Sequence, residues 1–207
     1  MINSLTRFAG RVAAALAVLG VALTLAGCGV NNVPTLEEQA KARWSEVQNQ
    51  YQRRADLIPN LVETVKGYAR QEEKVLTEVV EARAKATQMT LPADILTDPE
   101  KFKQYQEVQG QLGAALGRLI AITENYPDLK SNQNFLALQS QLEGTENRIA
   151  IARRDYIEAV RVYNTELATF PGRIWRSVMY SSAQPLATFD IPAQEQQTPR
   201  VDFGTKK

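Results

Sequence analysis

The sequence predicts an all-α protein: an antiparallel helical bundle of three long helices and one short C-terminal helix, followed by an extended tail. Three observations lead to this prediction. Apolar residues recur at spacings of three and four along most of the chain, as on the buried face of an amphipathic helix. A flanking row of apolar residues widens that face to the width a bundle helix needs. Helix-start and helix-stop signals divide the pattern at residues 98–99, 127 and 171–172.

The first 28 residues have the layout of a bacterial lipoprotein signal peptide. Two arginines precede an apolar stretch over residues 12–25, and Leu-Ala-Gly-Cys ends the segment at Cys28, the only cysteine. We predict cleavage before Cys28 and attachment of lipid to it, which anchors the chain to a membrane on its extracytoplasmic side. The alternative is an uncleaved spanning helix over residues 12–30, which leaves the same residues outside the cytoplasm.

Composition excludes several functional classes. The chain has 24 lysines and arginines against 23 acidic residues, so it lacks the basic excess expected of a nucleic-acid-binding protein. It has no histidine, the commonest general base and metal ligand. Di-iron sites of helical bundles and structural zinc sites therefore lack their usual ligands. We predict no metal, no cofactor, no catalytic residues and no nucleic-acid partner.

The first long helix is predicted over residues 36–88. Pro59 lies inside it, but the apolar stripe keeps its phase across the proline, which favours a kinked continuous helix over a break. Polar residues occupy two stripe positions, Arg54 and Glu72. At 1.5 Å per residue the helix would be about 80 Å long, so we expect its N-terminal part to project as a stalk toward the membrane. The stripe consists of Trp44, Val47, Tyr51, Ile58, Leu61, Val65, Tyr68, Val75, Val79, Ala82 and Ala86.

The second helix starts with a strong local signal. Asp98 provides an N-cap side chain and Pro99 fits the first helical position. The helix is predicted to run to Asn125, and three glycines weaken it unless a neighbouring backbone approaches closely there. These glycines are Gly110, Gly113 and Gly117.

The third helix is predicted over residues 135–170, with Ser131 or Asn132 as its cap and Pro171-Gly172 as its stop. A short amphipathic segment over residues 173–180 makes the fourth. The chain thus divides into a signal peptide (1–27), a linker from lipidated Cys28 (28–35), the bundle (36–180) and a tail (181–207). The tail is expected to be extended or disordered, with its two phenylalanines docking on the bundle.

Two polar clusters stand out on the predicted helices. The first flanks Pro59, and together with the fourth segment it forms the candidate partner surface. The second lies on the third helix, where Thr145 falls on the apolar stripe, so this cluster must approach the core and find polar partners. The candidate partner surface is Arg53, Arg54, Asp56, Asn60, Arg173 and Trp175. The predicted structural polar network is Arg53, Asp56, Thr145, Glu146 and Asn147.

Three stretches carry a resemblance to the LemA family. They are RRADLIPNLVETVKGYARQE (53–72), YPDLKSNQNFLALQSQLEGTENRIAIARRDYIEAVRVYNTEL (126–167) and PRVDF (199–203). The chain departs from the family pattern at Gln71 and Ile157, and its lipoprotein box replaces the usual transmembrane helix. The resemblance implies an antiparallel bundle outside the cytoplasm without agreed catalytic residues. It also implies an envelope membrane protein of the TPM-domain type as a partner, and one branch of the family takes part in magnetosome formation.

We therefore expect a lipid-anchored envelope protein whose bundle is a non-enzymatic scaffold or adaptor for other membrane or envelope proteins. It would face the periplasm or extracytoplasmic space, at the outer membrane if the source is Gram-negative, because Gly29 is not the aspartate typical of inner-membrane retention. Membrane remodelling by direct action on lipid is one alternative, and a hydrolase using the carboxylates of Asp56 and Glu146 is another. The wide apolar face of the first helix would also suit a homo-oligomer.

Overall fold

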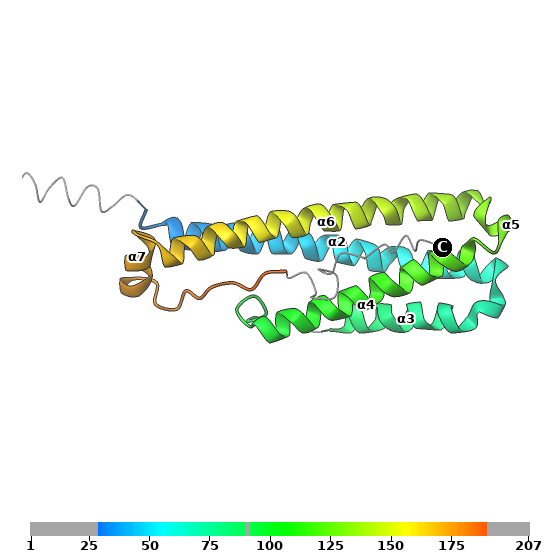
Figure 1. Cartoon of the computed structure of the whole chain (residues 1–207), viewed down its shortest axis with the longest axis horizontal. Helices are drawn as coiled ribbons and strands as arrows, with labels where there is room; N and C mark the ends of the chain where they lie inside the picture. The colour runs from blue at the N-terminus through cyan, green and yellow to red at the C-terminus, as the bar shows by residue number, and fades with distance from the viewer. Residues whose placement is uncertain (1–28, 90–91, 190–207) are drawn as a thin grey trace, which may run out of the picture.

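The molecule is an elongated bundle of helices (Figure 1), described here from a computed structural model that places residues 29–89 and 92–189. These residues contain no strand, so the predicted all-α bundle is confirmed. The helices are α2 (Asn32–Tyr68), η1 (Arg70–Glu72), α3 (Glu73–Gln88), α4 (Pro99–Thr123), α5 (Pro127–Lys130), α6 (Gln133–Ala168) and α7 (Gly172–Val178).

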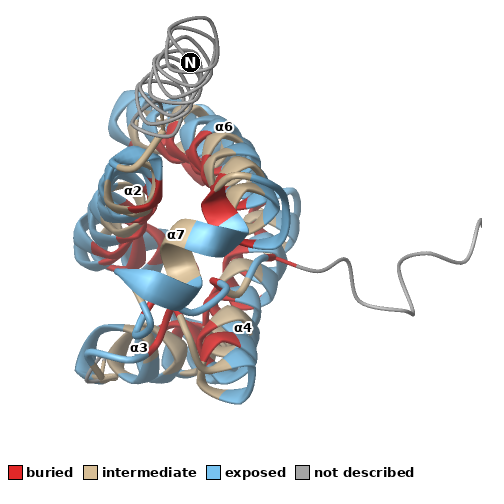
Figure 2. Cartoon of the chain, turned by 90° about the vertical axis from the view of Figure 1, so that its left-hand side faces the viewer, coloured by how far each residue is buried: buried red, intermediate tan, exposed pale blue. Residues whose placement is uncertain are grey.

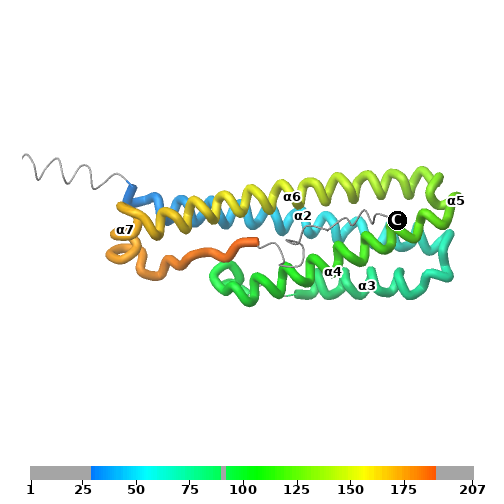
Figure 3. Tube along the Cα trace, in the orientation of Figure 1, coloured from blue at the N-terminus to red at the C-terminus, as the bar shows by residue number. Residues whose placement is uncertain are grey.

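The long helices form two antiparallel pairs. The chain runs along the bundle in α2, returns in α3, runs forward again in α4 and returns in α6 (Figure 3). The most extensive packing joins α2 to α6, and α3 packs mainly against α4. The first helix α2 also contacts α3, and this contact joins the two pairs. The short helix α7 closes one end of the bundle beside the start of α2.

The predicted helix over residues 36–88 is two helices, and this corrects the sequence-based boundary. The chain reverses at Ala69, whose φ and ψ are −128° and 52°, and not at Pro59. Folding back buries Leu76 and Val79 against the rest of the bundle. In a straight continuation these apolar side chains would extend beyond the neighbouring helices into water, which would lose their contribution of about 25 cal/mol per Å² of buried apolar surface.

Side-chain hydrogen bonds fix the reversal. Glu72, one of the two polar positions in the predicted stripe, accepts a hydrogen bond from the Tyr126 hydroxyl at 2.8 Å. The Tyr68 hydroxyl accepts one from the Asn132 amide at 2.9 Å. Both bonds connect the turn after α2 with the α5 region, so the polar stripe position marks the turn and not a continuing helix.

The N-terminal half of α2 is packed in the bundle and does not project as a stalk, contrary to expectation. Trp44 is only 5% exposed, and its ring centroid lies 5.3 Å from that of Phe102 and 5.4 Å from that of Tyr156. α2 also begins at Asn32, inside the predicted linker, because Val33 is buried in the same core. The N-terminal half of α2 is packed because α6, a helix of nearly the same length, runs beside it.

The helix continues through Pro59, as the phase of the stripe predicts. A proline at this position cannot donate a hydrogen bond to the carbonyl of Ala55, four residues earlier. That carbonyl instead accepts a hydrogen bond from Nε of Arg83 at 2.8 Å. Since Arg83 lies on α3, the reversal at Ala69 supplies the donor that the proline removes.

Arg83→Met is expected to lower the free energy of unfolding by about 1–2 kcal/mol, because it leaves a partly buried carbonyl without a donor. In a Pro59→Ala background the backbone N–H of residue 59 can bond to Ala55, so the same substitution should cost less than half as much. Urea unfolding of the four proteins measures both values. Equal costs in the two backgrounds would contradict the assigned role of Arg83.

The capping predictions are tested directly by the structure. The Asp98 carboxylate accepts hydrogen bonds from the backbone N–H groups of Glu100 and Lys101 at 3.0 and 3.2 Å. At the start of α6 the cap is Asn132, whose side chain accepts from the Phe135 N–H at 3.0 Å. The predicted start of α4 is therefore confirmed, and of the two candidates for α6 the structure selects Asn132.

Gly117 on α4 is exposed, and a Cβ added there would meet no atom within 4 Å. Gly117→Ala is therefore expected to raise the free energy of unfolding by about 1 kcal/mol through helix propensity. Gly172→Ala serves as the opposite case, because its Cβ would lie 2.2 Å from the Glu166 carbonyl oxygen. Urea unfolding should show stabilisation for the first variant and destabilisation for the second.

The described part of the tail lies extended against the bundle. Asn164 on α6 exchanges two hydrogen bonds of 2.9 Å with the backbone of Leu186. The Tyr156 hydroxyl donates to the Ala187 carbonyl at 2.7 Å. Phe189 is buried, as predicted, under the Arg153 guanidinium, which lies 4.4 Å from its ring centroid. Phe203 lies outside the described residues.

The anchor prediction cannot be compared with the structure, because residues 1–28 lie outside the described part. Among the helices that are described, none combines the length and the apolar character needed to cross a membrane.

Candidate binding groove

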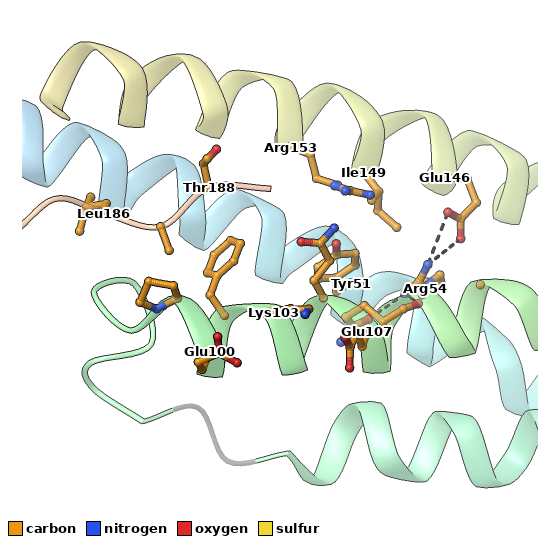
Figure 4. A pocket seen from close by; sticks show the side chains of 17 residues that line it. Tyr51, Arg54, Glu100, Lys103, Glu107, Glu146, Ile149, Arg153, Leu186 and Thr188 are labelled. Atoms are coloured by element: carbon orange, nitrogen blue, oxygen red, sulfur yellow. Dashed lines mark hydrogen bonds and ion pairs between the residues drawn. The ribbon is translucent and has the colours of Figure 1, made fainter. Parts of the chain in front are cut away.

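A groove of about 810 Å³ runs along the side of the bundle between α4 and α6, with α2 as its floor. We call it the α4–α6 groove. At one end its wall is the extended tail, and at the other end it reaches the ion pair between Arg54 and Glu146 (Figure 4). Its principal lining residues are Tyr51, Arg54, Glu100, Lys103, Glu107, Gly110, Glu146, Ile149, Arg153, Leu186, Ala187 and Thr188.

Arg54 joins three helices at the floor of the groove. Its Nη1 lies 3.2 Å from Oε1 of Glu146 on α6. Its Nη2 donates to the side-chain oxygen of Gln109 on α4 at 2.7 Å and to the Gln109 carbonyl at 3.1 Å. The arginine is 3% exposed, and its guanidinium carbon lies 5.1 Å from the centroid of the Tyr51 ring. A planar guanidinium with several donors suits such a bridge, since one side chain can hold α4 and α6 at a fixed separation.

The structure joins only some of the residues in the predicted polar network. Glu146 is in it, but its cationic partner is Arg54 and not Arg53, because Arg54 is the residue that lies on the buried face of α2. Thr145 is buried and donates its hydroxyl to the Gln141 carbonyl of its own helix at 2.8 Å. Arg53, Asp56 and Asn147 are exposed.

The candidate partner surface also separates into parts. Asp56 accepts a hydrogen bond from Gln52 at 2.7 Å on the exposed side of α2, where Asn60 lies as well. Arg173 and Trp175 belong to α7 at the end of the bundle. Arg54 is 22 residues beyond the start of α2, about 33 Å along the helix axis. The two carboxylates considered for hydrolysis, those of Asp56 and Glu146, have different hydrogen-bond partners.

Sequence reasoning missed Gln109, although a signal was available. Its spacing from Tyr105 and Leu112 is four and three, so it shares their face of α4, and it is 6% exposed. A polar residue at a stripe position is a candidate for a buried hydrogen bond. The same signal marks Arg54 on α2. The contribution of the tail to the groove had no comparable signal.

The groove has a balanced charge and one neutral phenol, that of Tyr51. Three carboxylates and three cations line it, namely Glu100, Glu107, Glu146, Arg54, Lys103 and Arg153. Burial raises the pKa of the Tyr51 hydroxyl, although Arg153 and Arg54 oppose this effect. Burial also raises the pKa of the Tyr105 hydroxyl, whose ring packs against Tyr51 but does not line the groove. Both phenols therefore stay neutral at physiological pH.

Across residues 29–89 and 92–189, no three carboxylate, cysteine or histidine side chains come together in a way that could hold a metal ion. The α4–α6 groove is lined by charged side chains of both signs, by the amides of Gln106 and Gln109 and by the Tyr51 and Phe102 rings. Such a lining suits a ligand with alternating polar and apolar groups, as an extended polypeptide has.

The fold and the groove together define an all-α bundle protein with an open groove between two helix pairs. A model of the LemA family matches residues 43–203, and the chain belongs to this family.

The chain is similar to magnetosome proteins and to a LemA protein. Magnetosome protein MamQ 1 of Paramagnetospirillum magneticum and magnetosome protein MamQ of Magnetospirillum gryphiswaldense are each 27% identical to the chain over 157 residues. These matches cover 68% of this chain and 58% of each MamQ protein, so the chain matches little more than half the length of these relatives. Protein LemA of Metamycoplasma hominis is 24% identical over 164 residues, which cover 79% of this chain and 68% of that protein.

Proposed function

We propose that this protein is a membrane-anchored, non-enzymatic adaptor that holds an extended segment of another envelope protein in the α4–α6 groove. Membership of the LemA family and similarity to proteins named as magnetosome proteins fit a role at a membrane. Lipid on Cys28 is the proposed anchor. The partner is a membrane protein of the envelope, of the TPM-domain type that family resemblance implies, on the periplasmic or extracytoplasmic side.

One observation carries the proposal: the bundle already binds an extended segment, its own tail, at the end of this groove. Leu186 and Ala187 are held through their backbone groups by Asn164, Tyr156 and Leu96. The open groove continues from this segment, because Leu186, Ala187 and Thr188 line its end. A second extended segment would therefore meet the kind of surface that holds the first.

The side chains that line the groove favour a polypeptide over a lipid chain as its ligand. Charged side chains of both signs project from its two walls, as Glu107 on α4 and Arg153 on α6 illustrate (Figure 4). An acyl chain would leave these groups without partners, whereas a peptide offers amides and charged side chains to them. Apolar contact is available beside them from Phe102 and Ile149.

Blocking the groove tests the adaptor role. A photo-reactive amino acid replaces Lys103, which lines the groove, or Lys85, which is exposed on α3 outside it. We expect crosslinking in cells to join position 103, and not position 85, to one segment of an envelope protein, as identified by mass spectrometry. Gly110→Trp should abolish this product, because Gly110 lines the groove and has no atom within 4 Å of a built Cβ.

Gly117→Trp is the matched control, since Gly117 is an exposed glycine of the same helix outside the groove. It should leave the crosslink unchanged. Products joined only to residues 190–207 of the same chain would show that the groove serves the tail and would overturn the proposal. Products joined only to a second copy would assign the groove to a homo-oligomer instead.

The anchor has its own test. Cys28→Ala is expected to abolish incorporation of labelled fatty acid and to leave an unprocessed chain. If the size of the protein is unchanged and no label enters the wild type, the uncleaved spanning helix is correct.

A further inference from the structure

The turn before α7, the helix itself and the residue after it expose four large apolar side chains within ten positions of the chain. Phe170, Val178 and Met179 are 81%, 72% and 58% exposed, the highest values among the large hydrophobic residues that the structure describes. Ile174, one turn before Val178, is 48% exposed. We call these four residues the α7 patch. Single exposed apolar residues are ordinary, whereas a cluster marks a surface that contacts another apolar phase or partner.

The α7 patch lies at the end of the bundle from which the chain leads to the apolar N-terminal segment. A Cβ built on Gly29 would lie 3.5 Å from the Pro171 ring, so the first described residue lies beside the turn before α7. The Asn32 amide donates to the Glu166 carboxylate at 3.3 Å and holds the two chain segments together. Figure 2 views this end of the bundle, with α7 lying across it.

The charged residues of α7 itself are both arginines, and the Glu166 carboxylate beside the turn before α7 accepts the hydrogen bond from Asn32. Residues 167–189 contain Arg173 and Arg176 and no acidic residue. Arg173 is exposed, and Arg176 donates to the Ala183 carbonyl at 3.0 Å, which holds α7 against the extended tail. Exposed apolar side chains with neighbouring arginines are the combination by which protein surfaces bind bilayers that contain anionic lipid.

We propose that the α7 patch inserts into the surface of a lipid bilayer containing anionic headgroups. The occupant is lipid and not a second protein, because the chain before Gly29 contains the apolar stretch over residues 12–25, and here the inference rests on the membrane anchor of the proposed function. The bundle then stands with this end on the bilayer and with the Arg54 part of the α4–α6 groove about 33 Å away from it. This contact does not depend on the groove having a partner.

Lipid-quenching measurements on the full-length protein test this contact. An environment-sensitive fluorescent amino acid replaces Val178, or in a control Leu136, which is 48% exposed near the start of α6. The protein is reconstituted in vesicles of phosphatidylcholine and phosphatidylglycerol with a quencher attached at the shallow part of the acyl chain. We expect strong quenching at position 178 and none at position 136.

Two further variants separate insertion from mere tethering nearby. With the fluorophore at Met179, Phe170→Ser combined with Ile174→Ser should abolish the quenching, although the N-terminal anchor is intact. Arg173→Gln should weaken the contact equilibrium about fivefold, the factor that corresponds to about 1 kcal/mol for one basic residue at an anionic surface. Arg148→Gln, on an exposed position of α6, is its control and should have no effect.

Equal quenching at positions 178 and 136 would overturn the proposal. A second result would also overturn it: the fluorophore at position 178 emits as in an apolar environment, but no lipid-attached quencher reduces this emission. That result would show that protein covers the α7 patch. Gly110→Trp should leave the quenching at position 178 unchanged, so failure of this proposal and failure of the adaptor role give different results.

Discussion

Glu146→Leu is expected to lower the free energy of unfolding by about 3 kcal/mol, because it leaves the buried guanidinium of Arg54 without its counter-charge. The Arg54 side chain is 4% exposed and that of Glu146 44% exposed, so the arginine cannot recover its hydration while the carboxylate is already partly solvated. Arg54→Met should cost less, about 1–2 kcal/mol, because it removes the charge itself and leaves Gln109 without its donor. Urea unfolding followed by far-UV circular dichroism measures both.

The double variant distinguishes this explanation from a general loss of packing. Arg54→Met with Glu146→Leu should be more stable than the sum of the single costs implies, since no unpaired charge remains. Glu143→Leu, an exposed position one turn earlier on α6, should change stability by less than about 0.5 kcal/mol. If Glu146→Leu lowers the free energy of unfolding no more than Glu143→Leu does, the Arg54 bridge between the three helices does not contribute to stability.

Trp44→Ala is expected to lower the free energy of unfolding by about 4 kcal/mol, the cost of a large cavity in an aromatic core. The Trp44 ring contacts Phe102, Tyr105 and Tyr156, and its centroid lies 6.1 Å from that of Phe189. Losing this ring should also loosen the tail, so limited proteolysis is expected to cut residues 183–189 faster than in the wild type. Trp44→Phe keeps an aromatic ring in the core and should retain more than half of the free energy of unfolding that Trp44→Ala loses.

This measurement also decides between the packed helix and the stalk that the sequence predicts. An exposed tryptophan on a stalk could be replaced by alanine at a cost below about 0.5 kcal/mol, since surface substitutions have small effects. A cost of that size, with unchanged proteolysis of the tail, would contradict the packing of α2 against α4 and α6 described above.

The α4–α6 groove shows how far the sequence leads toward a site. The sequence identifies Arg54 as a polar residue at an apolar stripe position, and Glu146 as part of a cluster that approaches the core. Their pairing cannot be inferred from the sequence, because they are 92 residues apart. Arg53 and Asp56, the predicted partners, lie at almost the same distance from Glu146 along the chain. The difference between Arg53 and Arg54 is one position on the helix, about 100° of rotation, and only the packed neighbours show which direction is inward.

The sequence by itself determined the features that depend on neighbours within one or two helical turns. The Asp98 cap, the stop before α7 and the continuation of α2 through Pro59 are of this kind, because each depends on local backbone geometry. The tertiary structure decided the reversal at Ala69, the partners of Arg54 and the place on the bundle where residues 183–189 dock. These depend on burial of apolar surface between segments far apart in the chain, and no local pattern specifies which segments meet.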